Sequence, residues 1–119
     1  MPEFEVLKSE VDAFVDERDW AVFHTPKNLA MCLSVEASEL LELYQWQIWH
    51  TGETAPGGGP PDPTRIAEEV GDIMISLLNF CRVAGIDPIS AARTKLRSVK
   101  KKYPVDEVRG SAVRPANES

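Results

Sequence analysis

The chain has 119 residues, a length that fits one domain and lets folding bury roughly two thirds of the unfolded surface. Its hydrophobic fraction, 43%, is ordinary for a globular protein and too high for a disordered one. The net charge of −6 is unevenly spread: residues 1–92 hold 16 acids and 5 bases, and residues 93–119 hold 8 bases and 3 acids. An acidic body argues against binding of a nucleic-acid polymer, which needs basic side chains facing the phosphates.

The sequence shows no targeting or membrane segment. The N-terminus is acidic and no apolar stretch follows it, so we expect no signal peptide. The most apolar segment, residues 73–80, is much shorter than the roughly 20 residues of a membrane span. Cys32 and Cys81 each lie in an apolar helical stretch, and we expect two buried thiols rather than a disulfide, although a pair stays possible. We therefore expect a cytoplasmic protein.

Four helices are predicted from apolar residues at helical spacing, over residues 2–19, 29–49, 63–84 and 88–102. Asn28 is the expected N-cap of the second helix, and Asp62 or Thr64 that of the third. Gly85 is expected to end the third helix, and Tyr103-Pro104 the fourth.

The segments between and after these helices lack regular structure in the prediction. Residues 51–63 are rich in Gly and Pro and form a flexible surface loop. No segment alternates polar and apolar residues as a strand does, so the fold is expected to be all-α. We expect one domain over residues 1–105 and a flexible C-terminal tail over 106–119.

Carboxylates interrupt the apolar stripes of the second and third helices. Glu36 and Glu39 lie on or beside one stripe, and Glu69 and Asp72 lie on the other. Residues three apart point the same way on a helix, so each pair converges. Like charges near a core are costly unless a cation compensates them, and oxygen ligands select hard cations such as Mg²⁺. The sequence therefore predicts a Mg²⁺ site between these helices.

Two other interpretations of these acids stay open at this point. A single E-x-x-E pair on a helix is usually a solvated face. Glu42 and Glu68 lie well off the paired positions and are expected to face solvent, although Glu68 can exchange roles with Glu69 because it stands four residues before Asp72.

Glu36-Ala-Ser-Glu39 followed by Glu69-Val-Gly-Asp72 resembles the E-x-x-E…E-x-x-D motif of the all-α nucleoside triphosphate pyrophosphohydrolases, the MazG-like superfamily. Further stretches look like the dCTP pyrophosphatase branch: Glu17-Arg-Asp-Trp20, Phe23-His24-x-Pro26-x-Asn28-Leu29, Glu39-Leu40-x-Glu42-Leu43, Gln45-Trp46 and Lys102-Tyr103-Pro104. The resemblance covers about residues 4–105.

The resemblance implies Mg²⁺-dependent hydrolysis of a nucleoside triphosphate, dCTP or a modified pyrimidine deoxynucleotide, to the monophosphate and pyrophosphate. It also implies a dimer or homotetramer, with four-helix bundles completed across chains. By position, the metal ligands would be Glu36, Glu39, Glu69 and Asp72. The substrate-binding residues would be Trp20, His24, Asn28, Trp46, Lys95, Lys102 and Tyr103.

The chemistry of these residue types agrees with that implication. Phosphoryl transfer needs mainly charge neutralisation and an oriented water. A carboxylate that is not fully used as a ligand can orient or deprotonate the water, and Glu39 is our candidate. Trp20 and Trp46 offer flat faces to a base. Lys95 and Lys102 are seven residues apart, hence on one helix face, and can reach a triphosphate.

Each of these assignments has a plainer alternative. The tryptophans can be core residues at helix ends, His24 a loop imidazole bonded to nearby backbone, and the basic segment a solvated face. His50 and Trp49 match no motif and are expected at the surface or an interface. For the whole protein, a di-iron carboxylate protein is disfavoured because no E-x-x-H motif exists. A non-catalytic nucleotide-binding or helical interaction protein remains the second candidate.

Two positions depart from the family pattern. Ser76 stands where an aromatic residue often follows the last acid, and Val99 stands where an asparagine is usual. Both departures leave the four carboxylates in place, so we expect them to affect nucleotide affinity and substrate choice.

Overall fold

The structure is a computed structural model that describes residues 2–49 and 51–111. The chain divides into two compact units, Met1–Gly85 and Ile86–Ser119, and each is considered by itself. The described residues contain helices and no strand, and their one extended pairing is an isolated antiparallel bridge between Gln47 and Thr54. The all-α prediction is therefore confirmed.

The first unit begins with α1 (Glu3–Glu17) and the short 3-10 helix η1 (Trp20–Phe23). α1 ends two residues earlier than expected, because Asp19 adopts a left-handed conformation (φ 53°) that turns the chain into η1. The Arg18 guanidinium donates to the Phe14 carbonyl oxygen (3.0 Å) and lies 3.9 Å from the centroid of the Phe14 ring.

The second helix, α2 (Pro26–Glu42), differs from the prediction at both ends. Its N-cap is Thr25, whose Oγ1 accepts the Asn28 backbone N–H (3.2 Å), so the expectation that Asn28 is the cap is wrong. Pro26 occupies the first helical position, where its missing N–H costs nothing.

α2 also stops at Glu42, short of Trp49, because the following residues bond across a turn instead of along a helix. The Ile48 N–H donates to the Glu53 carbonyl oxygen (2.7 Å), and the Ala55 N–H donates to the Trp46 carbonyl oxygen (2.6 Å). This stretch, 44–49, is dominated by aromatic and β-branched side chains, which lose rotamer freedom in a helix.

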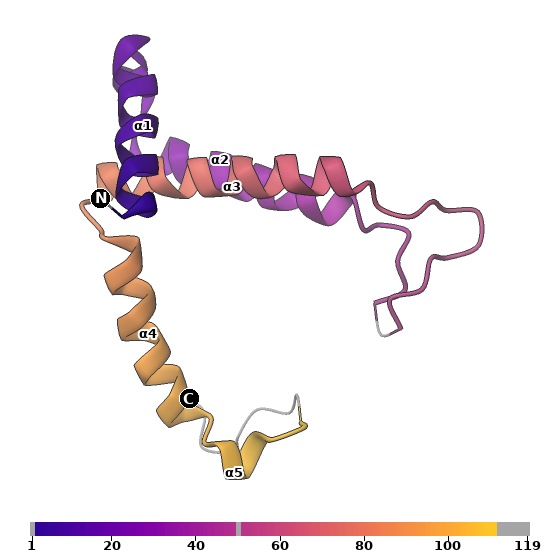
Figure 1. The fold of residues 1–119 in the computed structure, drawn as a ribbon. Coiled ribbons are helices and arrows are strands. Elements are labelled where there is room, and N and C mark those ends of the chain that lie inside the picture. The colour runs from indigo at the N-terminus through magenta and orange to yellow at the C-terminus, as the bar shows by residue number, and fades with distance from the viewer. Residues whose placement is uncertain (1, 50, 112–119) are drawn as a thin grey trace. The chain divides into compact units, whose positions relative to one another are not determined.

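α3 (Pro63–Ala84) has the predicted bounds. The Asp62 Oδ1 caps its start by accepting the Thr64 N–H (2.9 Å), and Gly85 ends it in the left-handed region (φ 70°) with its N–H bonded to the Cys81 carbonyl oxygen. α2 and α3 run side by side as a hairpin, and α1 packs against α3 (Figure 1).

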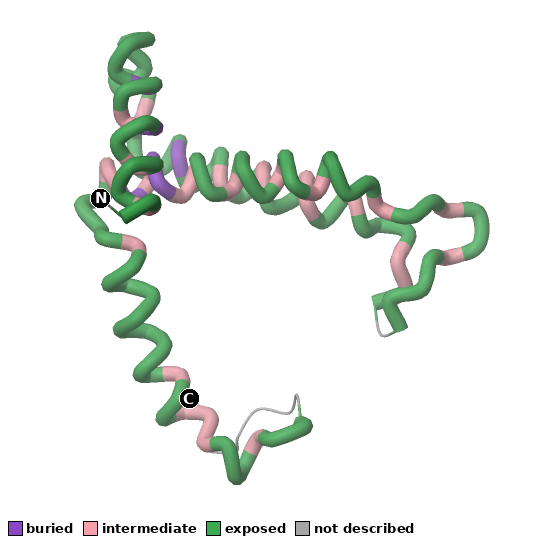
Figure 2. Tube along the Cα trace, in the orientation of Figure 1, coloured by how far each residue is buried: buried purple, intermediate pink, exposed green. Residues whose placement is uncertain are grey.

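The core of this unit is small and lies where α1 meets the other two helices (Figure 2). Val11 and Val15 of α1 are buried there, and Val15 is only 1% exposed. Their buried partners come from α2 and α3: Leu29, Leu78, Asn79 and Cys81. The prediction of two buried thiols is right for Cys81 and wrong for Cys32, which is exposed on α2.

Much of the apolar surface that the sequence assigns to a core is exposed in this single chain. On α3, Ile73 and Leu77 are half-buried, whereas Val70 (52%) and Met74 (43%) are exposed. The large apolar side chains that are exposed in this way come from all three helices: Val6, Leu7, Phe14, Met31, Val35, Leu41, Val70, Met74 and Ile75. The unit therefore presents an apolar surface without a partner among the described residues.

The second unit contains α4 (Pro88–Lys102), with the predicted bounds, and α5 (Val105–Val108). The Asp87 Oδ1 caps α4 by accepting the N–H groups of Ile89 and Ser90. α5 is a turn of helix where a structureless tail was expected; it begins after Pro104, with acids in its first turn that suit a helix N-terminus. Residues 112–119 of the expected tail, and His50, lie outside the described residues.

The division into one domain over 1–105 and a flexible tail stays a prediction. In the described part of the chain, no single helix is long and apolar enough to cross a membrane. Only α3 and α4 counted together have the length and apolar composition of a span, and a break separates them.

Candidate active site

Three carboxylates from the two helices of the hairpin come together in the first unit. Glu36 projects from α2, and Glu69 and Asp72 project from α3. Each contributes one oxygen atom, and these oxygens all lie within 4.8 Å of one another. The structure therefore joins the two acidic pairs that the sequence singles out on separate helices.

Glu39, the fourth predicted ligand, lies beside these three carboxylates. Burial raises the pKa of Glu36 from 4.5 to about 7, with the nearby negative charges of Glu39 and Asp72 adding to the rise. The pKa of Glu69 is also raised, by burial first and then by the charge of Glu39. Glu39 is thus close enough to act on both neighbours without belonging to the tight group of three.

The buried atoms of the cluster fit a cation. The Oε2 atoms of Glu36 and Glu69 are buried and have no hydrogen-bond partner among the described residues. A buried carboxylate oxygen without a hydrogen-bond partner raises the free energy of the folded state, and a cation that binds its lone pair removes this cost. Oxygen atoms from carboxylates are the ligands of hard divalent cations, so the residues present suit such an ion.

The solvated-face interpretation is wrong for Glu36 and Glu69, which are half-buried, and right for Glu42 and Glu68, which are exposed. Of the two neighbouring acids, Glu69 supplies the clustered oxygen and Glu68 is exposed. Ser76 is half-buried one turn beyond Asp72 on α3.

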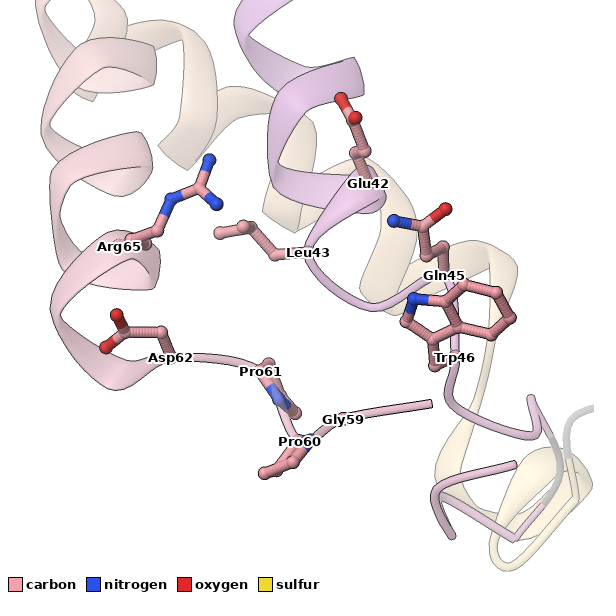
Figure 3. A pocket seen from close by; sticks show the side chains of 9 residues that line it. All are labelled: Glu42, Leu43, Gln45, Trp46, Gly59, Pro60, Pro61, Asp62 and Arg65. Carbon is pink, nitrogen blue, oxygen red and sulfur yellow. The ribbon is translucent and has the colours of Figure 1, made fainter. Parts of the chain in front are cut away.

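A pocket of about 280 Å³ opens at the loop end of the hairpin (Figure 3). Its lining comes from the end of α2, the start of α3 and the loop between them: Glu42, Leu43, Gln45, Trp46, Gly59, Pro60, Pro61, Asp62 and Arg65. Glu42 stands three residues after Glu39, and Arg65 four residues before Glu69. One helical turn is about 5.4 Å, so the pocket lies roughly one turn from the carboxylates.

Trp46, a predicted substrate-binding residue, lies in this pocket and is 49% exposed. Its ring packs against the backbone of Gly58: a Cβ built at Gly58 would lie 2.6 Å from Trp46 Cγ, closer than real contacts allow. A glycine at position 58 therefore permits the loop backbone to approach the indole, and with half of its surface exposed Trp46 is not a core residue of this unit.

Trp20 and His24 lie at the opposite end of the hairpin from Trp46. Trp20 is 43% exposed and makes an edge contact with Phe14 (ring centroids 5.5 Å apart), so it is no core residue of this unit either. The 17 residues of α2 separate the two ends by about 25 Å. One chain therefore does not bring Trp20 and His24 to Trp46.

His24 makes a contact that the sequence did not predict. Its Nδ1 lies 3.0 Å from the Arg82 Nη2 of α3, so the plainer alternative, a ring bonded to nearby backbone, is not what the structure shows. The same guanidinium contacts Asp12 of α1 (Nε to Oδ1, 3.3 Å) and Asn79 (Nη2 to Oδ1, 3.4 Å). The sequence offered one signal for this contact: Arg82 is a single cation within an apolar stretch of the third helix.

The remaining predicted residues divide between the units. The Asn28 amide nitrogen donates to the Phe23 carbonyl oxygen (3.1 Å), which closes the turn that carries His24. In the second unit, Lys95 is exposed on α4, whereas Lys102 and Tyr103 are half-buried at its end, with the Lys102 Nζ 6.0 Å from the Tyr103 ring centroid. Their substrate-binding roles stay predictions.

Residues 31–113 match the model of the MazG-like family. The chain belongs to the MazG-like family. It is also similar to solved and characterised relatives: the crystal structure of a pyrophosphatase from Archaeoglobus fulgidus superposes with a TM-score of 0.71 at 33% identity, covering 87% of this chain and 94% of that one.

Among named proteins, dCTP pyrophosphatase 1 of mouse is 35% identical over 112 residues, and that of human is 33% identical over 112 residues. Each alignment covers 93% of this chain but only 65% of the mammalian protein, so the chain spans less than two thirds of the length of these relatives. The resemblance to the MazG-like superfamily is thereby confirmed, and the chain is similar to these dCTP pyrophosphatases over the aligned residues.

Proposed function

We propose that this protein is a Mg²⁺-dependent nucleoside triphosphate pyrophosphohydrolase that converts a deoxynucleoside triphosphate to the monophosphate and pyrophosphate. The observation that carries the proposal is the cluster of Glu36, Glu69 and Asp72 oxygens within 4.8 Å, with buried oxygens that lack partners among the described residues. Its relatives named pyrophosphatases support the same reaction class.

Each carboxylate has a distinct part in this proposal. Glu36, Glu69 and Asp72 would hold Mg²⁺, which neutralises charge on the phosphate oxygens when it is bound. Glu39 lies outside the tight group of three but within electrostatic reach of Glu36 and Glu69. Its carboxylate is therefore available to accept a proton from the attacking water and to orient that water toward phosphorus.

The pocket beside the cluster is the proposed base site. Trp46 offers a half-exposed indole face there, with the Gly58 backbone close against its ring. The substrate we propose is dCTP or a modified pyrimidine deoxynucleotide, since two mammalian relatives are named dCTP pyrophosphatases. Substrate-binding roles for Lys95, Lys102 and Tyr103 also remain part of the proposal.

The proposed enzyme is a dimer or homotetramer. Exposed apolar side chains on α1, α2 and α3, such as Phe14, Met31 and Met74, leave a helical face that a second copy would bury. We also infer that Trp20 and His24 of one chain lie near Trp46 of another in this assembly, because a single chain does not bring them together. The cytoplasmic location stays a prediction from the sequence.

The test is a panel of unmodified and 5-modified deoxynucleoside triphosphates with Mg²⁺, scored for pyrophosphate and for inorganic phosphate. We expect pyrophosphate and monophosphate in equal amounts, with a pyrimidine substrate preferred. Release of inorganic phosphate alone would contradict the reaction class.

A non-catalytic nucleotide-binding protein is the alternative that the same panel addresses. It would bind nucleotide and Mg²⁺ in a titration and release no product from any of them. Glu39→Gln separates the two cases further, because the proposal expects this variant to bind Mg²⁺ and lose turnover, whereas a binding protein has no turnover to lose.

A further inference from the structure

The Arg82 guanidinium connects three side chains at the end of the hairpin where His24 lies. It contacts His24 Nδ1 at 3.0 Å, Asp12 Oδ1 at 3.3 Å and Asn79 Oδ1 at 3.4 Å. Asn79 is buried and the Arg82 side chain is only 26% exposed. A partly buried cation held from α1 and α3 has a fixed position, so the atom that it offers to His24 is fixed as well.

The chemistry of this contact decides which nitrogen of His24 carries the proton. A guanidinium has only donors and stays charged, so the Nδ1 atom that faces it must accept. Nδ1 is then unprotonated, and the proton of the neutral ring lies on Nε2. Burial and the Arg82 charge both lower the pKa of His24 from 6.5, which agrees with a neutral ring.

The other edge of the ring is available to a ligand. His24 is half-buried, and its Nε2 makes no hydrogen bond to any described residue. The turn beneath the ring is rigid, because the His24 N–H donates to the Ala21 carbonyl oxygen (3.1 Å) and the Asn28 amide donates to the Phe23 carbonyl oxygen (3.1 Å). Nε2–H is therefore a donor of fixed identity on a fixed backbone.

We propose that Arg82 is a positioning residue that holds His24 as its Nε2–H tautomer, so that His24 donates one hydrogen bond to an acceptor oxygen or nitrogen of the nucleotide. The tautomer is a property of this chain alone, whereas the contact with the nucleotide rests on the proposed function. An imidazole ring that exchanges tautomers would present an acceptor at Nε2 part of the time. It would then not distinguish a hydrogen-bond acceptor on the ligand from a donor.

The test of the positioning role needs no substrate. The chain has 2 histidines, so ¹⁵N spectra of the wild type and of a His50→Gln variant assign the His24 nitrogens directly. In the wild type above pH 7 we expect a protonated Nε2 and an unprotonated Nδ1. In Arg82→Met we expect a mixture of tautomers and a higher His24 pKa, although burial, the larger cause, keeps it below 6.5.

Two further variants separate positioning from folding. Arg82→Lys retains a charged donor and should restore most of the Nε2–H tautomer, while Asp12→Asn removes the carboxylate behind Arg82 and should leave the tautomer unchanged. Melting temperatures report whether each variant is folded. An unchanged tautomer and pKa in a folded Arg82→Met protein would overturn the positioning role.

Kinetics then test the contact with the nucleotide. Loss of one neutral hydrogen bond predicts a KM for dCTP about fivefold higher in Arg82→Met, with kcat nearly unchanged because Glu39 is untouched. Binding of inorganic triphosphate should weaken equally if the acceptor is a phosphate oxygen, and not at all if it belongs to the base. A changed tautomer with an unchanged KM would overturn the contact between His24 and the nucleotide, but not the proposed hydrolysis. Absence of hydrolysis in the wild type would refute the proposed function, but not the tautomer assignment.

Discussion

Replacing Glu36 by glutamine should stabilise the metal-free protein at alkaline pH. The folded structure raises the Glu36 pKa from 4.5 to about 7, mainly by burial and then by the charge of Glu39. A raised carboxyl pKa means that folding favours the protonated form, so the metal-free protein is most stable below pH 4.5 with respect to this group. That stability is lost as the pH rises through about 7, and an amide avoids the loss.

The size of the effect follows from the same shift. A rise from 4.5 to about 7 corresponds to about 3 kcal/mol of unfavourable interaction for an ionised Glu36. Solvent reaches the cluster at exposed Asp72 and screens part of it, which leaves about 1–2 kcal/mol. For a domain of this size that is a rise in melting temperature of roughly 4–8 °C. Mg²⁺ at 100 times its Kd should instead stabilise the wild type by about 2.7 kcal/mol and the variant far less.

The assay is thermal unfolding at pH 8, with a chelator and with Mg²⁺. Glu68→Gln is the matched control, because Glu68 is an exposed acid next to Glu69 and lies outside the cluster. We expect Glu36→Gln to melt higher than the wild type in chelator and lower in Mg²⁺, and Glu68→Gln to match the wild type in both. A Glu36→Gln protein that melts lower in chelator would refute the account of a strained acidic cluster.

Protonation of Glu36 should also compete with Mg²⁺ binding, because the pKa of this carboxyl is raised to about 7. The apparent Kd for Mg²⁺, measured by calorimetry, should be about tenfold higher at pH 6 than at pH 8, and a Kd independent of pH would contradict this. Gly58→Ala should displace the Trp46 ring, shift its fluorescence and weaken dCTP binding by about 1–3 kcal/mol. Gly59→Ala, with open space around its Cβ, should leave the Trp46 fluorescence as in the wild type, and equal fluorescence shifts in the two variants would be evidence against the packing described. Val15→Ala should lower the free energy of unfolding in urea by about 2 kcal/mol, since this side chain is 1% exposed, and a change below about 0.5 kcal/mol would mean that α1 does not depend on it.

Local sequence signals predicted the ends of α3 and α4, although the equally local Thr25 cap at the start of α2 was missed. Asp62, Gly85 and Asp87 each bond to backbone within four residues, and the bounds of α3 and α4 agree with the prediction. The end of α2 was missed because it depends on backbone bonds from 46 and 48 to residues 53–55, which periodicity does not contain.

The acidic cluster was predictable from local helical spacing, whereas the contacts between distant parts of the chain were not. Spacing places Glu36 and Glu69 on the faces where the two helices of a hairpin meet, so their convergence follows from the sequence. The contact between His24 and Arg82 joins residues 58 apart, and no local pattern reports such a pair. Periodicity likewise shows that Val70 and Met74 share the apolar face of α3, but not whether the same chain covers it.

The measurement that bears most directly on the proposed enzyme is pyrophosphate released from dCTP as a function of Mg²⁺ concentration, for the wild type and for Glu39→Gln. We predict release in a one-to-one ratio with dCMP that saturates with Mg²⁺, and a loss of at least about a hundredfold in kcat for the variant while it still binds Mg²⁺. Wild-type protein that binds Mg²⁺ and releases no pyrophosphate, or a Glu39→Gln variant that turns over normally, would contradict the assignment.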